Sequence, residues 1–382
     1  MVTGRLAILV PSSAEAESSP EFRYLDGYRT LQARRVFPTV EVMRFGSEPI
    51  RWEAARADAV LLLASPNVLI AAASLTAMKH LLEGGAGAAL PYPLTAVLGA
   101  SSEGVHTLRG YELLEARILA GAPVPPGVRP VHRPAAMFAG GAFADLTTRY
   151  PVPELVRLHD LPAEVRAGLG VGHAGVCHEF IDYYGEPRPD VLAFVPEGAR
   201  DVLEIGCARG ETGRLLQEEL GCRVTGVELN PVAAREAARV LHRVVCGDFE
   251  RLELAGAFDL VLATELFEHL VDPFAFLAKA RALVRAGGRI LLSTPNTGHY
   301  SIVQDLLAGR WDYLPVGLLC YTHVRFFTEA TLRDWLEMAG FTRYRIVPQT
   351  TELPERFRSL GGGLEVNEAS LGTKGFYVLI DV

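Results

Sequence analysis

The sequence predicts an α/β fold, in which a mostly parallel sheet carries helices on both faces. Two observations support this. Short apolar runs of strand length alternate with helical stretches through residues 199–382, as in a doubly wound sheet. The first run, Asp201–Ile205, leads directly into a glycine-containing turn and a helical stretch, Gly210–Gly221. A smaller α/β layer is predicted in the first part of the chain.

The turn after the first strand indicates a nucleotide-cofactor site. Gly206 and Gly210 allow the backbone to turn sharply and to approach a ligand closely. The next predicted strand, Cys222–Leu229, brings a carboxylate, Glu228, to its end. In a doubly wound sheet both strand ends lie at the same crevice, where Glu228 could accept hydrogen bonds from both hydroxyls of a ribose.

The spacing of the glycines decides between cofactor classes. A dinucleotide fingerprint reads G-x-G-x-x-G, because a pyrophosphate must sit on the helix N-terminus. Here the run is Glu204-x-Gly-x-Ala-x-Gly210, and we expect the Glu204 carboxylate to repel a diphosphate but to suit a cofactor with an ammonium group. The run resembles the first motif, E/D-x-G-x-G-x-G, of class I S-adenosylmethionine (SAM)-dependent methyltransferases, with Ala208 in place of the middle glycine. A βαβ unit that binds no ligand is the alternative.

The following elements come in the order that such a sheet requires. Arg243–Val245 is a short strand, and Phe258–Glu265 is a fourth, almost wholly apolar one. A helix from Pro273 to about Arg285 ends at a glycine pair, and Arg289–Asn296 supplies the fifth parallel strand.

The last part of the chain extends the resemblance. Thr328 is a predicted N-cap for a helix that runs to Ala339. Phe341–Pro348 and Gly375–Val382 read as two final strands, separated by a glycine-rich segment at Gly361–Gly363. The resemblance covers about residues 183–382 and implies a seven-stranded Rossmann-like methyltransferase sheet whose last strand is antiparallel.

The same resemblance implies a set of cofactor-binding residues. The acid of the Gly247-Asp248 pair would hold the adenine amino group with Phe249 as its apolar neighbour, and Glu265 would line the pocket. The full predicted set is Glu204, Gly206, Cys207, Gly210, Glu228, Leu229, Asp248, Phe249 and Glu265.

Methyl transfer to a hydroxyl needs a group that removes its proton, and the pKa of histidine suits this role. His269 follows the fourth strand, His299 follows the fifth, and His323 lies before the last helix. Open α/β sheets bind ligands beyond those strand ends. We expect His323 to be the base, His269 to be the second candidate, and simple capping or packing to be the alternative for His269.

Aromatic residues between the fifth strand and the last helix predict an acceptor-binding wall. Their faces stack on sugar C–H surfaces and on planar rings alike, so they do not distinguish these acceptors. Arg325 could anchor a carboxylate or the loop itself. The predicted substrate-binding residues are His299, Tyr300, Trp311, Tyr313, Tyr321 and Arg325. Only Asp305 and Asp312 suggest grouped carboxylates, so we expect metal-independent chemistry with no metal ligands.

Residues 309–313 and 321–328 look like those of a methyltransferase group often encoded with, or fused to, bacterial glycosyltransferases. This resemblance implies methyl transfer to a hydroxyl of a sugar or another polyhydroxylated small molecule. O- or C-methylation of a quinone-like or polyketide aromatic ring is the alternative reaction. A non-catalytic scaffold with a SAM fold is the alternative from another class.

The first part of the chain predicts strands at Arg5–Val10, Val40–Arg44, Ala57–Pro66 and Ala86–Pro91, with a helix at Leu69–Glu83. This order is vaguely similar to an A-type glycosyltransferase without its metal-binding Asp-x-Asp. We therefore expect residues 1–150 to be an accessory α/β domain, either a degenerate glycosyltransferase-like domain or an unrelated one. Residues 151–198 should form a helical linker that covers the cofactor cleft, and residues 199–382 the methyltransferase domain.

The composition of the chain limits the classes of substrate and partner that we expect it to bind. A net charge of −8 over 382 residues without a basic run argues against a nucleic-acid substrate and favours a small-molecule acceptor. The five cysteines show no zinc spacing. No membrane span and no export signal is visible, so a cytoplasmic location is expected. A homo-oligomer or a glycosyltransferase partner is left open.

Overall fold

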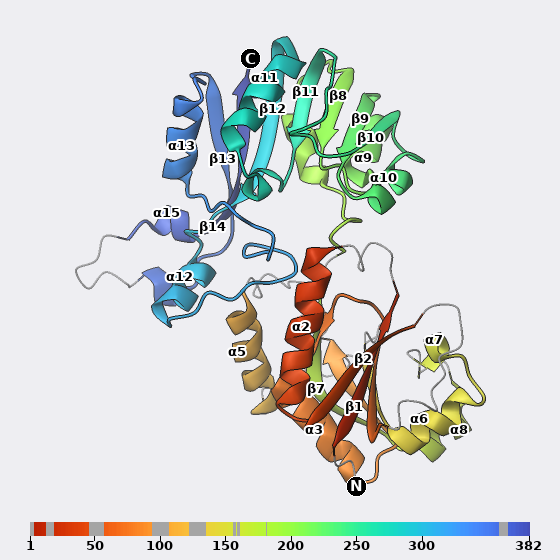
Figure 1. The fold of residues 1–382 in the computed structure, drawn as a ribbon. Coiled ribbons are helices and arrows are strands. Elements are labelled where there is room, and N and C mark those ends of the chain that lie inside the picture. The colour runs from red at the N-terminus through yellow and green to blue at the C-terminus, as the bar shows by residue number, and fades with distance from the viewer. Residues whose placement is uncertain are drawn as a thin grey trace. The chain divides into compact units, whose positions relative to one another are not determined.

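The computed structural model describes residues 4–12, 19–45, 57–93, 107–121, 135–155, 158, 161–180, 182–358 and 366–382. The chain divides into two compact units, which we call the first unit (Met1–Ile181 with Asp312–Pro315) and the second unit (Asp182–Trp311 with Val316–Val382). Within the described residues each unit is built on a seven-stranded sheet (Figure 1). The predicted glycine-rich segment at Gly361–Gly363 lies outside the described residues.

The sheet of the second unit has the predicted topology. Its strand order is β10-β9-β8-β11-β12-β14-β13, with five parallel strands followed by β14, which is antiparallel to both β12 and β13. The strands are β8 (Asp201–Ile205), β9 (Arg223–Glu228), β10 (Arg243–Cys246), β11 (Phe258–Ala263), β12 (Val284–Pro295), β13 (Tyr344–Thr350) and β14 (Thr373–Asp381).

Helices follow these strands and flank the sheet (Figure 1). They are η3 (Pro189–Phe194), α9 (Glu211–Leu220), α10 (Pro231–Ala237), η4 (Phe267–His269), α11 (Pro273–Leu283), α12 (Tyr300–Leu307), α13 (Glu329–Met338), α14 (Glu355–Arg358) and α15 (Glu368–Leu371). Thr328 caps α13 as predicted, because its side chain accepts the Thr331 amide.

The period-two pattern of the strands explains why helices lie on both faces of this sheet. Leu203 and Val261 belong to the hydrophobic core on one face, whereas their neighbours Val202 and Leu262 belong to the core on the other. Because both faces of the central strands are buried, the strands read as continuous apolar runs. No helix among the described residues has the length and apolar character that a bilayer crossing requires.

The first unit carries its own sheet, in the order β2-β1-β3-β6-β5-β7-β4, in which β6 is antiparallel to both neighbours. Its strands are β1 (Arg5–Pro11), β2 (Thr39–Phe45), β3 (Ala59–Leu63), β4 (Val68–Leu69), β5 (Ala88–Pro93), β6 (Ala135–Ala139) and β7 (Val171–Glu179). Its helices are α2 (Pro20–Arg34), α3 (Ala72–Glu83), α5 (Leu108–Leu119), α6 (Gly140–Thr147), α7 (Val152–Leu155) and α8 (Ala163–Leu169).

One structural expectation is wrong in this region. Residues 151–198 were expected to form a helical linker, but β7 occupies Val171–Glu179 and pairs in parallel with β5 inside the first unit's sheet. The strand packs so closely against α3 that only glycine fits at position 175. A Cβ at Gly175 would come within 2.7 Å of the Ser74 side chain on α3. A strand that contains small residues for packing lacks the β-branched pattern that announces a strand in sequence.

Arg29 on α2 fixes the turn that follows β3. Its side chain is buried and donates to the backbone carbonyls of Pro66 (2.7 Å) and Val68 (3.0 Å), while Asp26 pairs with it at 2.6 Å. Burial lowers the pKa of Arg29 to about 10, which leaves it charged at neutral pH. The guanidinium therefore satisfies carbonyls that would otherwise be buried without donors.

We expect Arg29→Ala to destabilise the first unit by about 3 to 5 kcal/mol, because two carbonyls lose their donor and Asp26 loses a partner. Hydrogen exchange of the β3 amides, Ala59–Leu63, measures this unit specifically. Arg149→Ala, at an exposed i,i+4 pair with Asp145, is the control and should cost under about 0.5 kcal/mol. Equal exchange rates in the Arg29 variant and the wild type would contradict the assigned role.

Candidate active site

The glycine-containing turn of the second unit is a run of left-handed backbone at the end of β8. The φ angles are +73° at Gly206, +50° at Ala208 and +83° at Gly210. A Cβ at Gly210 would lie 2.9 Å from Leu241 Cγ, so a side chain is excluded there. The loop therefore exposes backbone rather than side chains where α9 begins, as a cradle for a ligand requires.

Glu228 holds this loop from the neighbouring strand. Its buried carboxylate accepts the Ala208 amide through Oε2 at 2.9 Å and the Asn230 amide through Oε1 at 2.7 Å. Burial raises the pKa of Glu228, and the backbone hydrogen bonds oppose that rise. Leu229 follows at the end of β9 with 69% of its side chain exposed, which leaves an apolar surface beside the carboxylate. The glycine loop, the carboxylate and the leucine together fit an adenosine-bearing cofactor.

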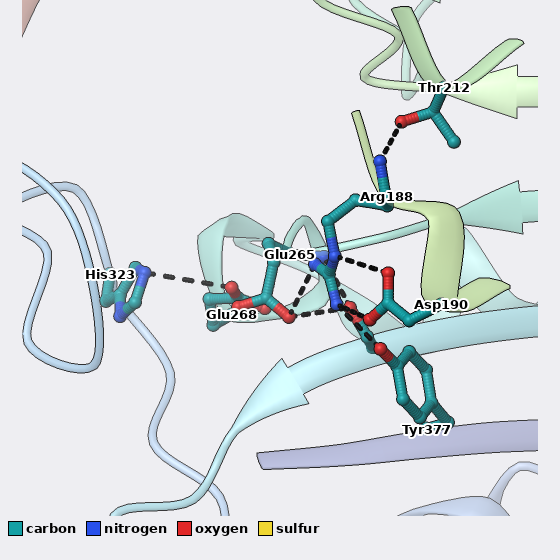
Figure 2. A network of polar contacts seen from close by, with 8 residues as sticks. Arg188, Asp190, Thr212, Glu265, Glu268, His323 and Tyr377 are labelled. Atoms are coloured by element: carbon teal, nitrogen blue, oxygen red, sulfur yellow. Dashed lines mark hydrogen bonds and ion pairs between the residues drawn. The ribbon is translucent and has the colours of Figure 1, made fainter. Parts of the chain in front are cut away.

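Glu265 has an unusual backbone at the end of β11. Its φ is +48°, which a non-glycine residue rarely adopts and which often marks a functional site. Oε1 accepts a hydrogen bond from Ser293 Oγ at 2.6 Å. The same atom forms an ion pair with Arg188 at 3.4 Å (Figure 2). The carboxylate is thus fixed from two sides.

Arg188 is a residue that the sequence analysis missed. Its guanidinium also contacts Asp190 at 3.0 Å and the Tyr377 hydroxyl at 2.9 Å, and its amide donates to Thr212 Oγ1 (Figure 2). It links the segment before β8 to α9, β14 and Glu265. Arg188 belongs to no sequence motif, so the sequence alone could not predict this role.

Three side chains converge next to Glu265, and we call them the carboxylate–histidine cluster: Glu268, His269 and His323. One ligand-type atom from each lies within 4.8 Å of the others. His323 Nε2 is 3.7 Å from Glu268 Oε1 (Figure 2), and the two imidazole centroids are 4.7 Å apart. Burial, followed by the charge of Glu265, raises the pKa of Glu268 well above its ordinary value.

The loop that brings His323 to this cluster is fastened by main-chain hydrogen bonds. The Val324 and Arg325 amides both donate to the Glu268 carbonyl at 3.0 Å. Arg325 also donates from Nη2 to the Val271 carbonyl at 2.6 Å. Arg325 thus anchors the loop itself, one of the two roles expected for it.

Comparisons with known proteins agree with this geometry. Residues 178–345 match a family model described as a methyltransferase domain. The second unit is a SAM-dependent methyltransferase domain. The cofactor is accordingly SAM, as the glycine loop and Glu228 predicted.

Curated relatives share this region. A "Ubiquinone biosynthesis O-methyltransferase" of Xanthomonas axonopodis is 33% identical over 158 residues, which are 38% of this chain and 63% of that protein. A protein of the same description from Nitrosococcus oceani is 27% identical over 225 residues, 52% of this chain and 92% of that protein. Thus the chain spans less than two thirds of the first relative's length. The structure of a SAM-dependent methyltransferase from Archaeoglobus fulgidus matches 50% of this chain and 91% of its own, at 23% identity and a TM-score of 0.38.

The role expected for Glu204 in the methyltransferase domain is not supported. Its side chain is 3% exposed, accepts the Gly213 amide, and leaves Oε2 without a hydrogen bond among the described residues. Burial raises the pKa of Glu204 to about 8, so the group is mostly protonated at neutral pH. A buried neutral acid beneath α9 cannot supply the charge for an ammonium group.

The remaining predicted cofactor residues divide between surface and core. Asp248 is half-buried after β10 and accepts the Glu250 amide, so it stays a candidate for the adenine. Phe249 packs in the core, with its ring centroid 5.3 Å from that of Phe276. Cys207 is also buried, and a Cβ at Gly226 would meet its sulfur at 2.5 Å. Phe249 and Cys207 are thus core residues of the domain.

The structure makes His323, the first of the two expected bases, a poorer base than the sequence suggested, and His269 stays a prediction. Burial and the neighbouring His269 lower the pKa of His323 to about 3, so it is a weak acceptor for a hydroxyl proton. His299, the third histidine, is fully buried and caps α12; its ring nitrogens contact the Ser301 and Thr351 hydroxyls. The structure does not support acceptor binding by His299, because no face of its ring is accessible.

The predicted aromatic wall is only partly assembled. Trp311 lies edge-on to Phe326 at 5.1 Å, and Tyr321 is 46% exposed. Tyr300 packs against Phe357 at 5.1 Å. Tyr313 falls in the short segment that groups with the first unit, so the wall is not a continuous feature of the methyltransferase domain. The expectation of no metal ligands rested on finding no cluster, and the carboxylate–histidine cluster removes that premise.

The raised pKa of Glu204 predicts a pH effect on stability. The pKa of Glu204 is about 8 in the folded protein and 4.5 for an ordinary glutamate. Between these values the folded state keeps a proton that the unfolded chain loses. Stability should therefore fall as pH rises between about 5 and 8, by on the order of a few kcal/mol. Glu204→Gln removes this titration, and its urea midpoint should change less over that range. Parallel pH profiles for both proteins would refute the assignment.

The left-handed conformation of Ala208 predicts that Ala208→Gly stabilises the methyltransferase domain. An L-residue costs about 1 to 2 kcal/mol in this conformation, and the greater freedom of glycine in the unfolded chain recovers only part of that. We expect a net gain of about 0.5 to 1 kcal/mol, measured from hydrogen exchange of the β8 amides. Ala282→Gly, at an exposed position of α11, is the matched control and should lose about 1 kcal/mol.

Proposed function

We propose that the methyltransferase domain methylates a hydroxyl of a quinone-like aromatic ring. The observation that carries this proposal is the similarity to the Nitrosococcus oceani protein, which extends over 92% of that relative and is described as a ubiquinone biosynthesis O-methyltransferase. The Xanthomonas axonopodis relative has the same description. Sugar methylation, our first expectation, has no comparable support.

The cofactor side of the reaction follows from the strand ends of the sheet. Glu228 and Leu229 would hold the ribose and the adenine face, Asp248 the adenine edge, and the 206–210 loop the amino-acid part by its backbone. When bound, SAM supplies an electrophilic methyl group on sulfur. The protein's contribution is to hold the acceptor oxygen in line with that methyl group and to exclude water.

The acceptor side follows from the carboxylate–histidine cluster. It begins three residues after Glu265, at the carboxyl end of β11, where open α/β sheets bind their substrates. Its polar atoms face one another in a buried setting and can orient a hydroxyl group. Half-exposed Tyr321 and Trp311 would contribute ring faces to a planar acceptor.

The first unit would then act as an accessory α/β domain without chemistry of its own. The turn after β3, where an A-type glycosyltransferase would carry two acids, contains Ser65, Pro66 and Asn67. Those residues offer no carboxylate for a metal that holds a sugar diphosphate. Placement of the acceptor is the role we assign to this unit.

Equilibrium titration of the full chain with SAM tests the cofactor site. Glu228→Ala should weaken SAM binding about 10- to 100-fold, because charge-assisted hydrogen bonds are lost. Leu229→Asp alters an exposed side chain, so it should weaken binding about tenfold without loss of stability. Glu236→Ala on α10 is the control and should bind normally. If both the Glu228 and the Leu229 variants bind SAM as tightly as the wild type, the assigned cofactor site is wrong.

An acceptor panel then tests the reaction. We expect methylation of phenol-type and hydroquinone-type aromatic acceptors, with at least tenfold lower kcat/KM for glycosides and nucleotide sugars. Products are identified by mass spectrometry after transfer of a labelled methyl group. Transfer to sugars without transfer to aromatic hydroxyls would overturn the aromatic assignment and restore the sugar reading. SAM binding without turnover on any acceptor would favour the scaffold alternative.

A further inference from the structure

We propose that Lys279 on α11 is a positioning residue for the cofactor. Its ammonium group holds the turn after β10, residues 248–252, and this turn sets the place of the Asp248 carboxylate at the edge of the adenine. The hold on the turn follows from the contacts of Lys279 alone. Its effect on the cofactor rests on the proposed function, in which Asp248 binds the adenine.

Lys279 donates hydrogen bonds to the carbonyl oxygens of a single short turn. Nζ donates to the Phe249 carbonyl and, at 2.5 Å, to the Leu252 carbonyl, and it lies 3.5 Å from the Glu250 carbonyl. An ammonium group has three N–H donors and accepts no hydrogen bond, so these three oxygens match its full capacity. The partly buried side chain of Lys279 therefore ends against a turn that precedes it by 30 residues at Phe249.

The ring of Phe249 is a further contact of the ammonium group. Nζ lies 4.6 Å from the ring centroid, within the range of a cation–π interaction. Phe249 is 6% exposed, and its ring also packs against Phe276 of α11 with 5.3 Å between the centroids. Positions 276 and 279 are three residues apart, so they lie on the same face of α11. That face therefore contacts the turn with both a ring and a charge.

Residues 248–252 form a single hydrogen-bonded turn that depends on outside partners. The amides of Arg251 and Leu252 both donate to the Asp248 carbonyl, at 3.0 and 2.9 Å. An isolated turn of this kind is weakly stable, because two hydrogen bonds hardly offset the entropy lost in ordering its residues. The later carbonyls of a helical turn have no amide partners inside it. A cation at that end satisfies them and interacts favourably with the aligned peptide dipoles.

The same turn orients the Asp248 carboxylate. Oδ1 accepts the Glu250 amide at 2.9 Å, so the direction of the side chain follows the backbone of the turn. Oδ2 pairs at 3.4 Å with the exposed Arg251, a weak contact that a ligand can displace, and Asp248 itself is 39% exposed. The Gly247 amide donates to the Glu228 carbonyl at 2.9 Å, so the turn starts beside the residue assigned to the ribose. A shift of the turn therefore changes the spacing of the adenine and ribose contacts.

Apolar contacts should keep the domain folded when Lys279 is replaced. A Cβ at Gly247 would lie 3.1 Å from Leu252 Cδ2, so the Leu252 side chain folds back over the start of the turn. Leu252 and Leu254 also pack against the hydrophobic core on this face of the sheet. Loss of the ammonium group should thus loosen the turn without unfolding the domain, and a methionine keeps the apolar stem of the lysine.

Hydrogen exchange in the full chain tests the hold on the turn. In Lys279→Met the amides of Arg251 and Leu252 should exchange at least about tenfold faster than in the wild type, because local opening becomes easier. The β8 amides, Asp201–Ile205, should keep their protection, which shows that the sheet is still folded. Lys374→Met, at an exposed lysine of β14, is the matched control and should leave the turn unchanged.

A double-mutant cycle on SAM binding, measured by calorimetry, tests the role toward the cofactor. We expect Lys279→Met to weaken binding about three- to tenfold and Asp248→Asn to weaken it about tenfold. The double variant should bind about as weakly as Asp248→Asn alone, because Lys279 acts through that carboxylate. Adenosine, which lacks the methionine part of SAM, should lose the same factor as SAM in Lys279→Met. A lysine that only stabilised the fold would give equal losses with and without the Asp248 carboxylate.

Unchanged exchange of the turn amides in Lys279→Met would overturn the proposal, as would equal losses of SAM affinity with and without the Asp248 carboxylate. Equal effects of Lys374→Met and Lys279→Met would also overturn it, because the position of the lysine would then not matter. If Asp248→Asn binds SAM normally while Lys279→Met loosens the turn, the adenine assignment is wrong and the role of Lys279 toward the cofactor falls with it. No acceptor enters these measurements, so a failure of the aromatic assignment is seen separately.

Discussion

The candidate site depends on one constraint, the common edge at which the parallel strands β8, β9 and β11 end. A parallel sheet delivers the residues after each strand to the same side, so the glycine loop, Glu228 and Glu265 become neighbours although the chain separates them by up to about sixty residues. Local hydrogen bonds then fix each piece. Glu228 holds the loop through a hydrogen bond, and Ser293 holds Glu265 in the same way. Arg188 holds Glu265 by an ion pair (Figure 2).

Much of the second unit could be predicted because its signals are local. Continuous apolar runs predicted the central strands, whose two faces are both buried in the structure. The N-cap residue Thr328 predicted the start of α13. The glycine spacing and the acid at the end of β9 indicated the cofactor. Glu204 shows the limit of such reasoning: the predicted cofactor was right, but the charge argument was wrong, because burial that raises a pKa to about 8 cannot be read from a motif. In the first unit, β7 escaped prediction because its glycines serve packing against α3.

The carboxylate–histidine cluster escaped prediction for a different reason. Each histidine was noticed separately as a candidate base, and Glu268 was not singled out at all. The proximity of His323 to Glu268 is produced by two amide-to-carbonyl hydrogen bonds across more than fifty residues of chain. The hydrophobic periodicity of a sequence predicts helices and strands but not a contact between residues this far apart in the chain. Whether a histidine is a base or a ligand depends on its neighbours, and only the tertiary structure supplies them.

The position of β14 bears on how the sheet is assembled. Although it is the later strand, β14 lies inside the sheet between β12 and β13, whereas among the described strands β13 lies at the edge and pairs with β14 alone. β13 therefore joins the sheet only as the partner of β14, whose docking on β12 closes a loop of about eighty residues. We expect this half of the sheet to form last, because the loops to be closed are long and the stabilising contacts appear late. The native contacts of Tyr377, which hydrogen-bonds Arg188, would then be among the last to form in the domain.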